Sequence, residues 1–290
     1  MAKDYMIITD STCDLPERFR DYPFVDIIPF IYELNGVVYG KEKKISAKDF
    51  YDGMRNGGET KTAAANTFEI SEHMERALSN GKDVLFFCLS KGISSTIQNA
   101  YIARDELKEK YPDAEICVLE SLCASGGHGL LLWHAINNYK AGLTVRENME
   151  KLDMIKLNIV HKFTVDDLKY LMRGGRISRT TAAVGTMINL KPLMHVDVNG
   201  NLVGESKVRG RKRALNDMVK NMGDAMGKYK DNQEFILINQ SDCQEDSDYV
   251  ANMIIETYHP KELAIGDMTP TIGAHTGPGT IAIFFMGETR

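Results

Sequence analysis

Short apolar runs alternate with helical stretches along the first half of this 290-residue chain, and this alternation restricts its fold more than any other feature. Four runs have the length and composition of buried strands: residues 5–9, 25–31, 83–89 and 115–119. Helical patterns fill the intervals, and the helix over residues 68–78 begins with a capping pair, Asn66 and Glu69. Strands separated by helices of this size are joined by crossovers, which build a mostly parallel sheet. The first half therefore predicts an α/β domain.

The second half of the chain, from about residue 160, has a different pattern. Its clearest signal is a hairpin over residues 192–206, in which Asn199-Gly200 predicts a type I′ turn. The other expected elements are helices at 166–172, 211–228 and 247–258, and strands at 161–165, 235–239, 262–266 and 280–286. We therefore expect an N-terminal α/β domain over residues 1–160 and a C-terminal mixed α/β domain over residues 161–290.

Charge and cysteine usage exclude several classes of protein. The formal net charge of −5 supplies no basic field for nucleic acid or an anionic membrane surface. The longest apolar runs have the length of strands, whereas a membrane-spanning helix needs about 20 apolar residues, and the N-terminus shows no signal-peptide core. The five dispersed cysteines have no CxxC spacing, so neither a disulfide framework nor a zinc site is predicted. We expect a reduced, cytoplasmic protein without a cofactor, a nucleic-acid partner or an integral membrane association.

Three loops of the first half are candidate binding loops because each follows a predicted strand. Ligands of parallel sheets bind at this position, where free backbone N–H groups and helix dipoles gather. The loops comprise residues 10–14, 90–96 and 120–127. Their hydroxyls can hold an anion with neutral donors. A structural explanation stays open for each: Ser94 or Ser95 is more often a helix N-cap, Asp10 a turn cap, and Gly126-Gly127 a close packing site.

The second half contains two further candidates. Arg176 follows Gly174-Gly175 and suits a carboxylate or phosphate partner, although a surface arginine after a helix C-cap explains it equally well. His275 stands in a Gly/Pro-rich segment that predicts a turn, where it is able to donate to an anion or pass a proton near neutral pH. A structural loop explains it as well. The chain lacks a P-loop, a GxGxxG fingerprint, a nucleophile elbow and an HExxH motif, so no independent catalyst is predicted.

Six motifs in fixed order resemble those of one family. They occupy residues 10–16, 89–98, 167–177, 190–193, 207–212 and 272–279. The most specific is Asp167-Leu168-Lys169-Tyr170-Leu171-Met172-Arg173-Gly174-Gly175-Arg176-Ile177. On these motifs the chain is identified as a member of the DegV family, the fatty-acid-binding subunits of bacterial fatty acid kinase. The resemblance implies a two-domain DegV-like α/β fold, with a mostly parallel N-terminal sheet, a mixed C-terminal domain and a long-chain fatty acid between them.

The same resemblance implies a set of ligand-binding residues. We assign to this set Thr62, Ser94, Ser95, Arg176, His275 and Thr276. A separate ATP-dependent fatty acid kinase catalytic subunit would phosphorylate the bound carboxylate, and the chain itself would not be an enzyme. The basic run at residues 207–213 would dock that subunit through Arg209 or Arg211, with an ordinary solvated face as the alternative.

Two positions depart from the family pattern. The usual Thr-x-Gln-Pro-Ser segment reads Thr62-Ala63-Ala64-Ala65-Asn66, and Ser95 replaces a usual glycine. Such a change allows a different acyl preference or the loss of the kinase partner. Two other functions therefore stay open: an enzyme that acts on a small anionic metabolite in a wet, polar cleft, and a regulatory lipid sensor without a kinase.

Overall fold

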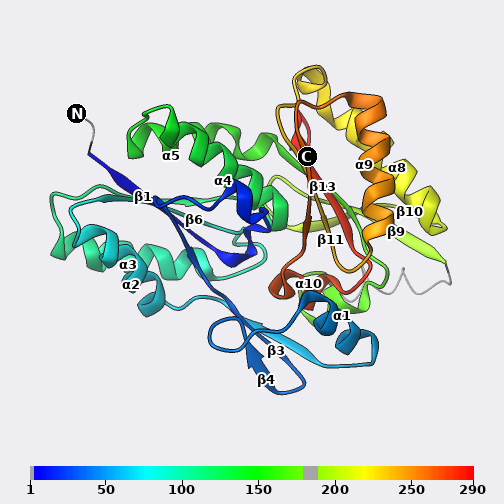
Figure 1. Ribbon diagram of the computed structural model, residues 1–290, viewed down its shortest axis with the longest axis horizontal. Helices are drawn as coiled ribbons and strands as arrows, with labels where there is room; N and C mark the ends of the chain where they lie inside the picture. Colours follow the sequence, from blue (N-terminus) through cyan, green and yellow to red (C-terminus); the bar gives the residue numbers. More distant parts are fainter. Residues whose placement is uncertain (1–2, 179–188) are drawn as a thin grey trace.

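The chain contains three separate sheets, seen in a computed structural model that describes residues 3–178 and 189–290. A four-stranded sheet belongs to the first half and a six-stranded sheet to the second, and Figure 1 shows them beside each other with helix α4 between them. A small three-stranded sheet lies below the first. The described helices include none with the length and apolarity that a membrane crossing requires.

The four-stranded sheet is parallel throughout, in line with the mostly parallel sheet that the sequence predicts, and its strand order is β2-β1-β6-β7. Its strands are β1 Tyr5–Asp10, β2 Val25–Ile28, β6 Asp83–Cys88 and β7 Ile116–Glu120. Helices α2 (Thr67–Leu78) and α3 (Thr96–Lys110) cover one face, while α4 (Ser125–Lys140) and α5 (Val145–Ile155) cover the other. The predicted capping box of Asn66 and Glu69 begins α2.

The prediction of one strand over residues 25–31 is wrong. The chain leaves the parallel sheet after Ile28 and passes through Pro29, which has no N–H for a ladder bond. It then enters the antiparallel sheet β4-β3-β5, which helix α1 (Ala47–Arg55) accompanies. The strands of this sheet are β3 Ile31–Leu34, β4 Val37–Tyr39 and β5 Thr60–Ala63. This small sheet places Thr62, on β5, beside the second half of the chain.

The six-stranded sheet is mixed, as the prediction of a mixed α/β second half requires. Its order is β10-β9-β8-β13-β11-β12, and among the described strands of this sheet only β11 and β12 form a parallel pair. The strands are β8 Ile159–Thr164, β9 Leu190–Val196, β10 Leu202–Arg209, β11 Ile236–Gln240, β12 Leu263–Asp267 and β13 Ile281–Met286. Helices α8 (Arg211–Met226) and α9 (Gln244–Tyr258) pack on its outer face. Short helices complete the chain: η1 Ser11–Cys13, η2 Glu17–Phe19, η3 Lys156–Asn158, α6 Lys169–Arg173, η4 Gly227–Tyr229 and α10 Pro270–Thr276.

The hairpin between β9 and β10 is present, but its predicted type I′ turn is wrong. Type I′ needs positive φ at both central residues, and of the Asn199-Gly200 pair only Gly200 has it, with φ +80°. The Asp197 carboxylate instead accepts hydrogen bonds from the N–H groups of Asn199 (2.9 Å) and Asn201 (2.8 Å), which makes a wider loop. A Cβ on Gly200 would lie 1.9 Å from Ser90 Oγ, so this loop packs tightly against the first half.

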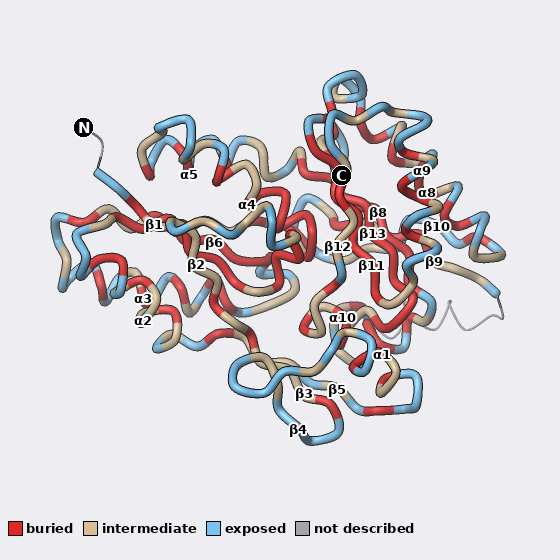
Figure 2. The backbone as a smooth tube through the Cα atoms, viewed as in Figure 1, coloured by how far each residue is buried: buried red, intermediate tan, exposed pale blue. Residues whose placement is uncertain are grey.

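Helix α4 joins the two halves through close backbone contacts. A Cβ on Gly126 would lie 2.0 Å from Asn239 Oδ1, and one on Gly127 would lie 2.0 Å from His161 Nε2. This confirms the packing interpretation of the glycine pair, and Figure 2 shows α4 and the strands of both large sheets as a continuous buried region. The exact division at residue 160 stays a prediction, since the first large sheet ends at Glu120 and the second begins at Ile159.

Candidate ligand-binding site

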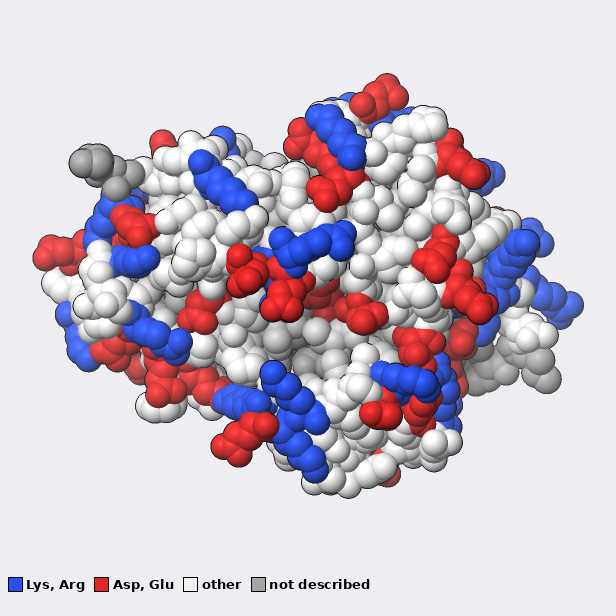
Figure 3. All heavy atoms as spheres, in the orientation of Figure 1, with Lys and Arg blue, Asp and Glu red and all other residues white. Residues whose placement is uncertain are grey.

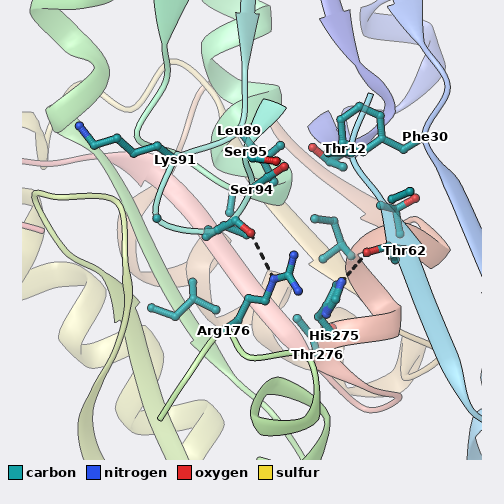
Figure 4. A pocket seen from close by; sticks show the side chains of 18 of the residues that line it. Thr12, Phe30, Thr62, Leu89, Lys91, Ser94, Ser95, Arg176, His275 and Thr276 are labelled. Carbon is teal, nitrogen blue, oxygen red and sulfur yellow. Dashed lines mark hydrogen bonds between the residues drawn. The ribbon is translucent and has the colours of Figure 1, made fainter. Parts of the chain in front are cut away.

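A cavity of about 480 Å³ lies between the two halves, within the range of about 300–1,000 Å³ that is typical of ligand sites. All six residues that the sequence assigns to a ligand line this one cavity: Thr62, Ser94, Ser95, Arg176, His275 and Thr276. Figure 4 shows them converging from the Ser94 loop, from β5, from α10 and, for Arg176, from the segment after α6. Their role as ligand contacts stays a prediction, but the structure brings them together from positions up to 214 residues apart.

The lining of the cavity is amphipathic. Apolar side chains from both halves make one part of the wall: Phe30, Leu89, Ile93, Leu171, Leu202 and Ile272. Hydroxyl, imidazole and guanidinium groups make the other part, together with Lys91 and Gln98. Such a wall is suited to a ligand that combines a long apolar body with one polar end.

His275 and Thr62 form one of the hydrogen bonds that join the two halves at the cavity. Thr62 lies on β5, and His275 lies in the last turn of α10, not in the turn that the sequence predicts. Thr62 Oγ1 and His275 Nε2 are 2.7 Å apart, and a dashed line marks this bond in Figure 4. A second bond supports the pair, because the Thr60 hydroxyl donates to the Ala274 carbonyl at 3.1 Å. The helix ends directly after His275 and Thr276, at Gly277, whose φ is +82°.

The protonation state of His275 follows from its surroundings. Burial lowers its pKa to about 4, and the nearby Arg176 cation acts in the same direction. In these surroundings the imidazole of His275 is neutral at pH 7. Its Nδ1 is buried and has no hydrogen-bond partner among the described residues. We assign the single ring hydrogen to Nε2, because Nε2–H then donates to Thr62 Oγ1 and no buried N–H group is left without an acceptor.

Ser94 and Ser95 lie in the loop that leads from β6 into α3. Ser95 occupies the N-cap position, but its side chain makes no capping bond within the described part of the chain. Ser94 Oγ accepts the Thr96 N–H at 3.3 Å, which is long for a capping bond, and lies 2.9 Å from Thr96 Oγ1. Helix capping therefore accounts for Ser94 only in part and does not account for Ser95.

Arg176 is half-buried and connects the two halves, so the surface explanation offered by the sequence is wrong. Its Nε donates to the Ile93 carbonyl at 3.2 Å, and its Nη1 donates to the Gly174 carbonyl. Gly175 turns the chain with φ +72°, as a glycine after a helix does. Gly174 is required by packing, because a Cβ there would lie 2.2 Å from His275 Nδ1. The glycine pair thus brings the guanidinium and the imidazole to the same wall.

Sequence reasoning missed several residues of the cavity wall. Thr12 and Lys91 stand in two loops that the sequence singles out, and their hydroxyl and ammonium groups are a usable signal. Phe30, Leu171 and Leu202 carried no signal, because an apolar side chain that lines a cavity has the same sequence pattern as one that fills a core. Only the packing of the two halves reveals them.

Arg209 and Arg211, the predicted docking residues, do not line the cavity. In Figure 3 basic side chains gather at the right-hand edge, where Figure 1 places β10 and α8. Arg209 is exposed at the end of β10. Arg211 is half-buried at the start of α8, and its Nε lies 2.8 Å from the Asp246 carboxylate, with Asp166 at 3.6 Å from Nη1. Arg211 is therefore occupied within the chain, whereas Arg209 faces solvent.

A second cleft, of about 420 Å³, lies on the other side of η1 and contains Asp14. The Asp14 side chain accepts the Ser125 hydroxyl at 2.6 Å and the Thr269 N–H at 2.9 Å. Asp14 is 5% exposed, and burial raises its pKa to about 7. This carboxylate thus holds the start of α10 while His275 stands near its end.

Together the fold and the cavity define an α/β protein whose two halves enclose an amphipathic cavity. The chain belongs to the DegV family: residues 4–288 match the family model described as "Uncharacterised protein, DegV family". It is 35% identical to a DegV domain-containing protein of Clostridium perfringens over 290 residues, covering 99% of each chain. A DegV domain-containing protein of Lactococcus lactis is 31% identical and aligns with 97% of this chain and 96% of its own.

Solved structures confirm the predicted DegV fold. A fatty-acid-binding DegV family protein from Thermus thermophilus superposes with a TM-score of 0.86 at 24% identity, covering 99% of this chain and all of its own. A stearic acid-binding protein from Eubacterium ventriosum gives 0.86 at 24% identity and 98% coverage of both chains. The fatty acid kinase B3 protein of Streptococcus pneumoniae, solved with linoleic acid, gives 0.85 at 19% identity, covering 98% of this chain and all of its own.

Proposed function

We propose that the protein binds one long-chain fatty acid in the cavity between its halves. The carboxylate lies against Thr62, Ser94 and His275, and the acyl chain lies along the apolar wall. The observation that carries this proposal is the Thr62–His275 hydrogen bond at the polar side of an amphipathic cavity. The Thermus, Eubacterium and Streptococcus proteins of the same fold, each described with a fatty acid, support it.

The energetics assign different tasks to the two walls. Burial of a 16-carbon chain contributes about 12 kcal/mol before costs, at about 0.8 kcal/mol for each methylene. A hydrogen bond to a charged group contributes only about 1.5–3 kcal/mol. The apolar wall therefore supplies most of the affinity. The hydroxyls determine where the carboxylate stops, and Arg176 lowers the cost of burying its charge.

The finer part of the proposal is that the protein presents this carboxylate to a separate ATP-dependent kinase subunit in the cytoplasm. The product would be an acyl phosphate, and the chain would take part as a carrier without catalysing the transfer. Arg209 supports this part, because it is an exposed cation on a chain of net charge −5. Charged residues of this kind mainly raise the rate of encounter between partners.

The two other functions are less well supported. An enzyme for a small anionic metabolite needs a polar cleft, whereas apolar side chains from both halves make one part of the wall of this cavity. A lipid sensor without a kinase would share the cavity and differ only in its partner. The test of the kinase step therefore decides between carrier and sensor.

That test combines the protein, a long-chain fatty acid, ATP and a fatty acid kinase catalytic subunit. We expect acyl phosphate only when all four are present, and a several-fold lower rate at about 0.15 M salt for Arg209→Ala. Lys44→Ala removes an exposed cation of the small sheet region and serves as the matched control with an unchanged rate. An unchanged rate for Arg209→Ala contradicts the docking role. If the wild-type protein yields no acyl phosphate when all four components are present, the kinase step is contradicted.

A further inference from the structure

Three of the hydroxyl side chains that line the cavity have different hydrogen-bond partners. Thr62 is bonded to His275, Ser94 to Thr96, and Thr12 to Asp10. A hydroxyl has one hydrogen to give and two lone pairs that accept. The partner of each hydroxyl therefore decides whether its hydrogen is available to a ligand. A carboxylate only accepts, so it binds best where hydroxyl hydrogens point into the cavity.

The direction of the Ser94–Thr96 bond follows from burial. Thr96 is fully buried, at 0% exposure, and Ser94 Oγ is the one acceptor recorded for its hydroxyl among residues 3–178 and 189–290. If Thr96 did not donate to Ser94, its hydrogen would stay buried without a partner, at a cost of about 1–3 kcal/mol. Ser94 is only half-buried and faces the cavity. Thr96 Oγ1–H is therefore the donor, and Ser94 Oγ is the acceptor.

This assignment leaves the Ser94 hydrogen free to point into the cavity. Ser94 Oγ accepts from the Thr96 hydroxyl at 2.9 Å and from the Thr96 N–H at 3.3 Å, which uses both of its lone pairs. The remaining hydrogen-bonding capacity of Ser94 is its own O–H. Bonds of this kind in a chain also strengthen one another, so a hydroxyl that accepts two bonds is a better donor.

Thr12 provides the contrast. Its hydroxyl and its N–H both donate to Asp10 Oδ1, the N–H at 2.9 Å, so its hydrogen is used inside the protein. Thr12 thus presents a lone pair to the cavity, which repels a carboxylate oxygen. Of these three hydroxyls, Thr62 and Ser94 therefore offer a donor to the cavity, and Thr12 offers an acceptor.

We infer that Thr96 is a positioning residue: its buried hydroxyl turns the Ser94 hydrogen into the cavity and so fixes where the ligand carboxylate binds. Thr96 does not line the cavity and acts only through Ser94. The inference rests on the proposed binding of a fatty acid. It extends the set of residues that determine head-group recognition to one that makes no contact with the ligand.

The test uses Thr96→Val, which keeps the shape of the side chain and removes the hydroxyl. Dissociation constants are measured for palmitate and for hexadecanol, which has the same chain length without the charge. We expect Thr96→Val to weaken palmitate binding by about threefold to tenfold and hexadecanol binding less, because bonds to charged groups are roughly twice as strong. Thr96→Ser restores the hydroxyl and should bind palmitate as the wild type does.

Two controls separate positioning from a general packing effect. In a Ser94→Ala background, Thr96→Val should cause no further loss, since the bond no longer exists. Thr164→Val removes another fully buried threonine hydroxyl, one without a partner in the described chain, and should leave binding unchanged. If Thr96→Val does not fold, Thr96→Ala replaces it, and the same dissociation constants for palmitate and hexadecanol are measured.

The outcomes are distinct. Palmitate binding equal to that of the wild type overturns the inference. Equal losses for palmitate and hexadecanol, or a loss that persists without Ser94, show a packing role and overturn it as well. A wild-type protein that binds no palmitate instead contradicts the proposed function, so the two failures are distinguishable.

Discussion

The two ends of helix α10 hold buried titratable side chains of opposite kind. At its start, the Thr269 N–H donates to the Asp14 carboxylate at 2.9 Å. In its last turn, His275 bonds to Thr62 at 2.7 Å. Burial moves both groups toward their neutral forms, raising the pKa of Asp14 to about 7 and lowering that of His275 to about 4.

The difference shows that the two ends depend on pH in different ways. His275 is uncharged throughout the physiological range, so the cavity end relies on the direction of hydrogen bonds. Asp14 changes its charge within that range, beside Arg20, Glu17 and Asp267 in the second cleft. Ligand binding at the cavity end should therefore be the same at pH 6 and pH 8. At the Asp14 end, the contribution to the free energy of unfolding should fall as pH rises.

The largest expected effect comes from Asp14→Asn. Between about pH 4 and pH 7 the folded state binds more protons at this carboxyl than the unfolded state does, so wild-type stability falls as pH rises through that range. A shift of this size corresponds to on the order of 4 kcal/mol. Asparagine accepts from Thr269, donates to Ser125 and tolerates the φ of +40° at this position.

The measurement is the free energy of unfolding in denaturant at pH 5 and pH 8. Relative to the wild type, Asp14→Asn should gain stability from pH 5 to pH 8, while the exposed control Asp113→Asn should not. If the free energy of unfolding of Asp14→Asn differs from that of the wild type by the same amount at pH 5 and pH 8, the pKa of Asp14 is not raised by burial.

The second effect sharpens the comparison at the cavity end. His275→Ala should weaken fatty-acid binding by about tenfold to a hundredfold, because the bond that orients Thr62 is lost. His134 is the matched control, since burial also lowers its pKa to about 4 but it does not line the cavity. Dissociation constants for a fatty acid are measured for the wild type, His275→Ala and His134→Ala at pH 6 and pH 8, and each should be the same at both pH values. Equal binding by the two variants would remove His275 from the site.

Sequence patterns predicted the parallel sheet and the position of the Ser94 loop because both depend on local periodicity. They failed at Pro29, where one apolar run serves two sheets, and at Asn199-Gly200, where hydrogen bonds to the Asp197 carboxylate make a wider loop. Thr62 came only from the resemblance to a family, since a threonine on a short exposed strand has no local signal. The apolar wall was not predictable, because it exists only where the two halves meet.

The most direct test of the central claim is native mass spectrometry of the gently purified protein, before and after addition of an isotope-labelled long-chain fatty acid. The account predicts one added mass for each chain, equal to that of one fatty acid, which exchanges for the labelled acid. The wild-type protein should keep this added mass through repeated washing with buffer that contains no fatty acid. Ser94→Ala should lose it after fewer washes. A protein that shows only its own mass, and that takes up none of the added acid, would contradict the account.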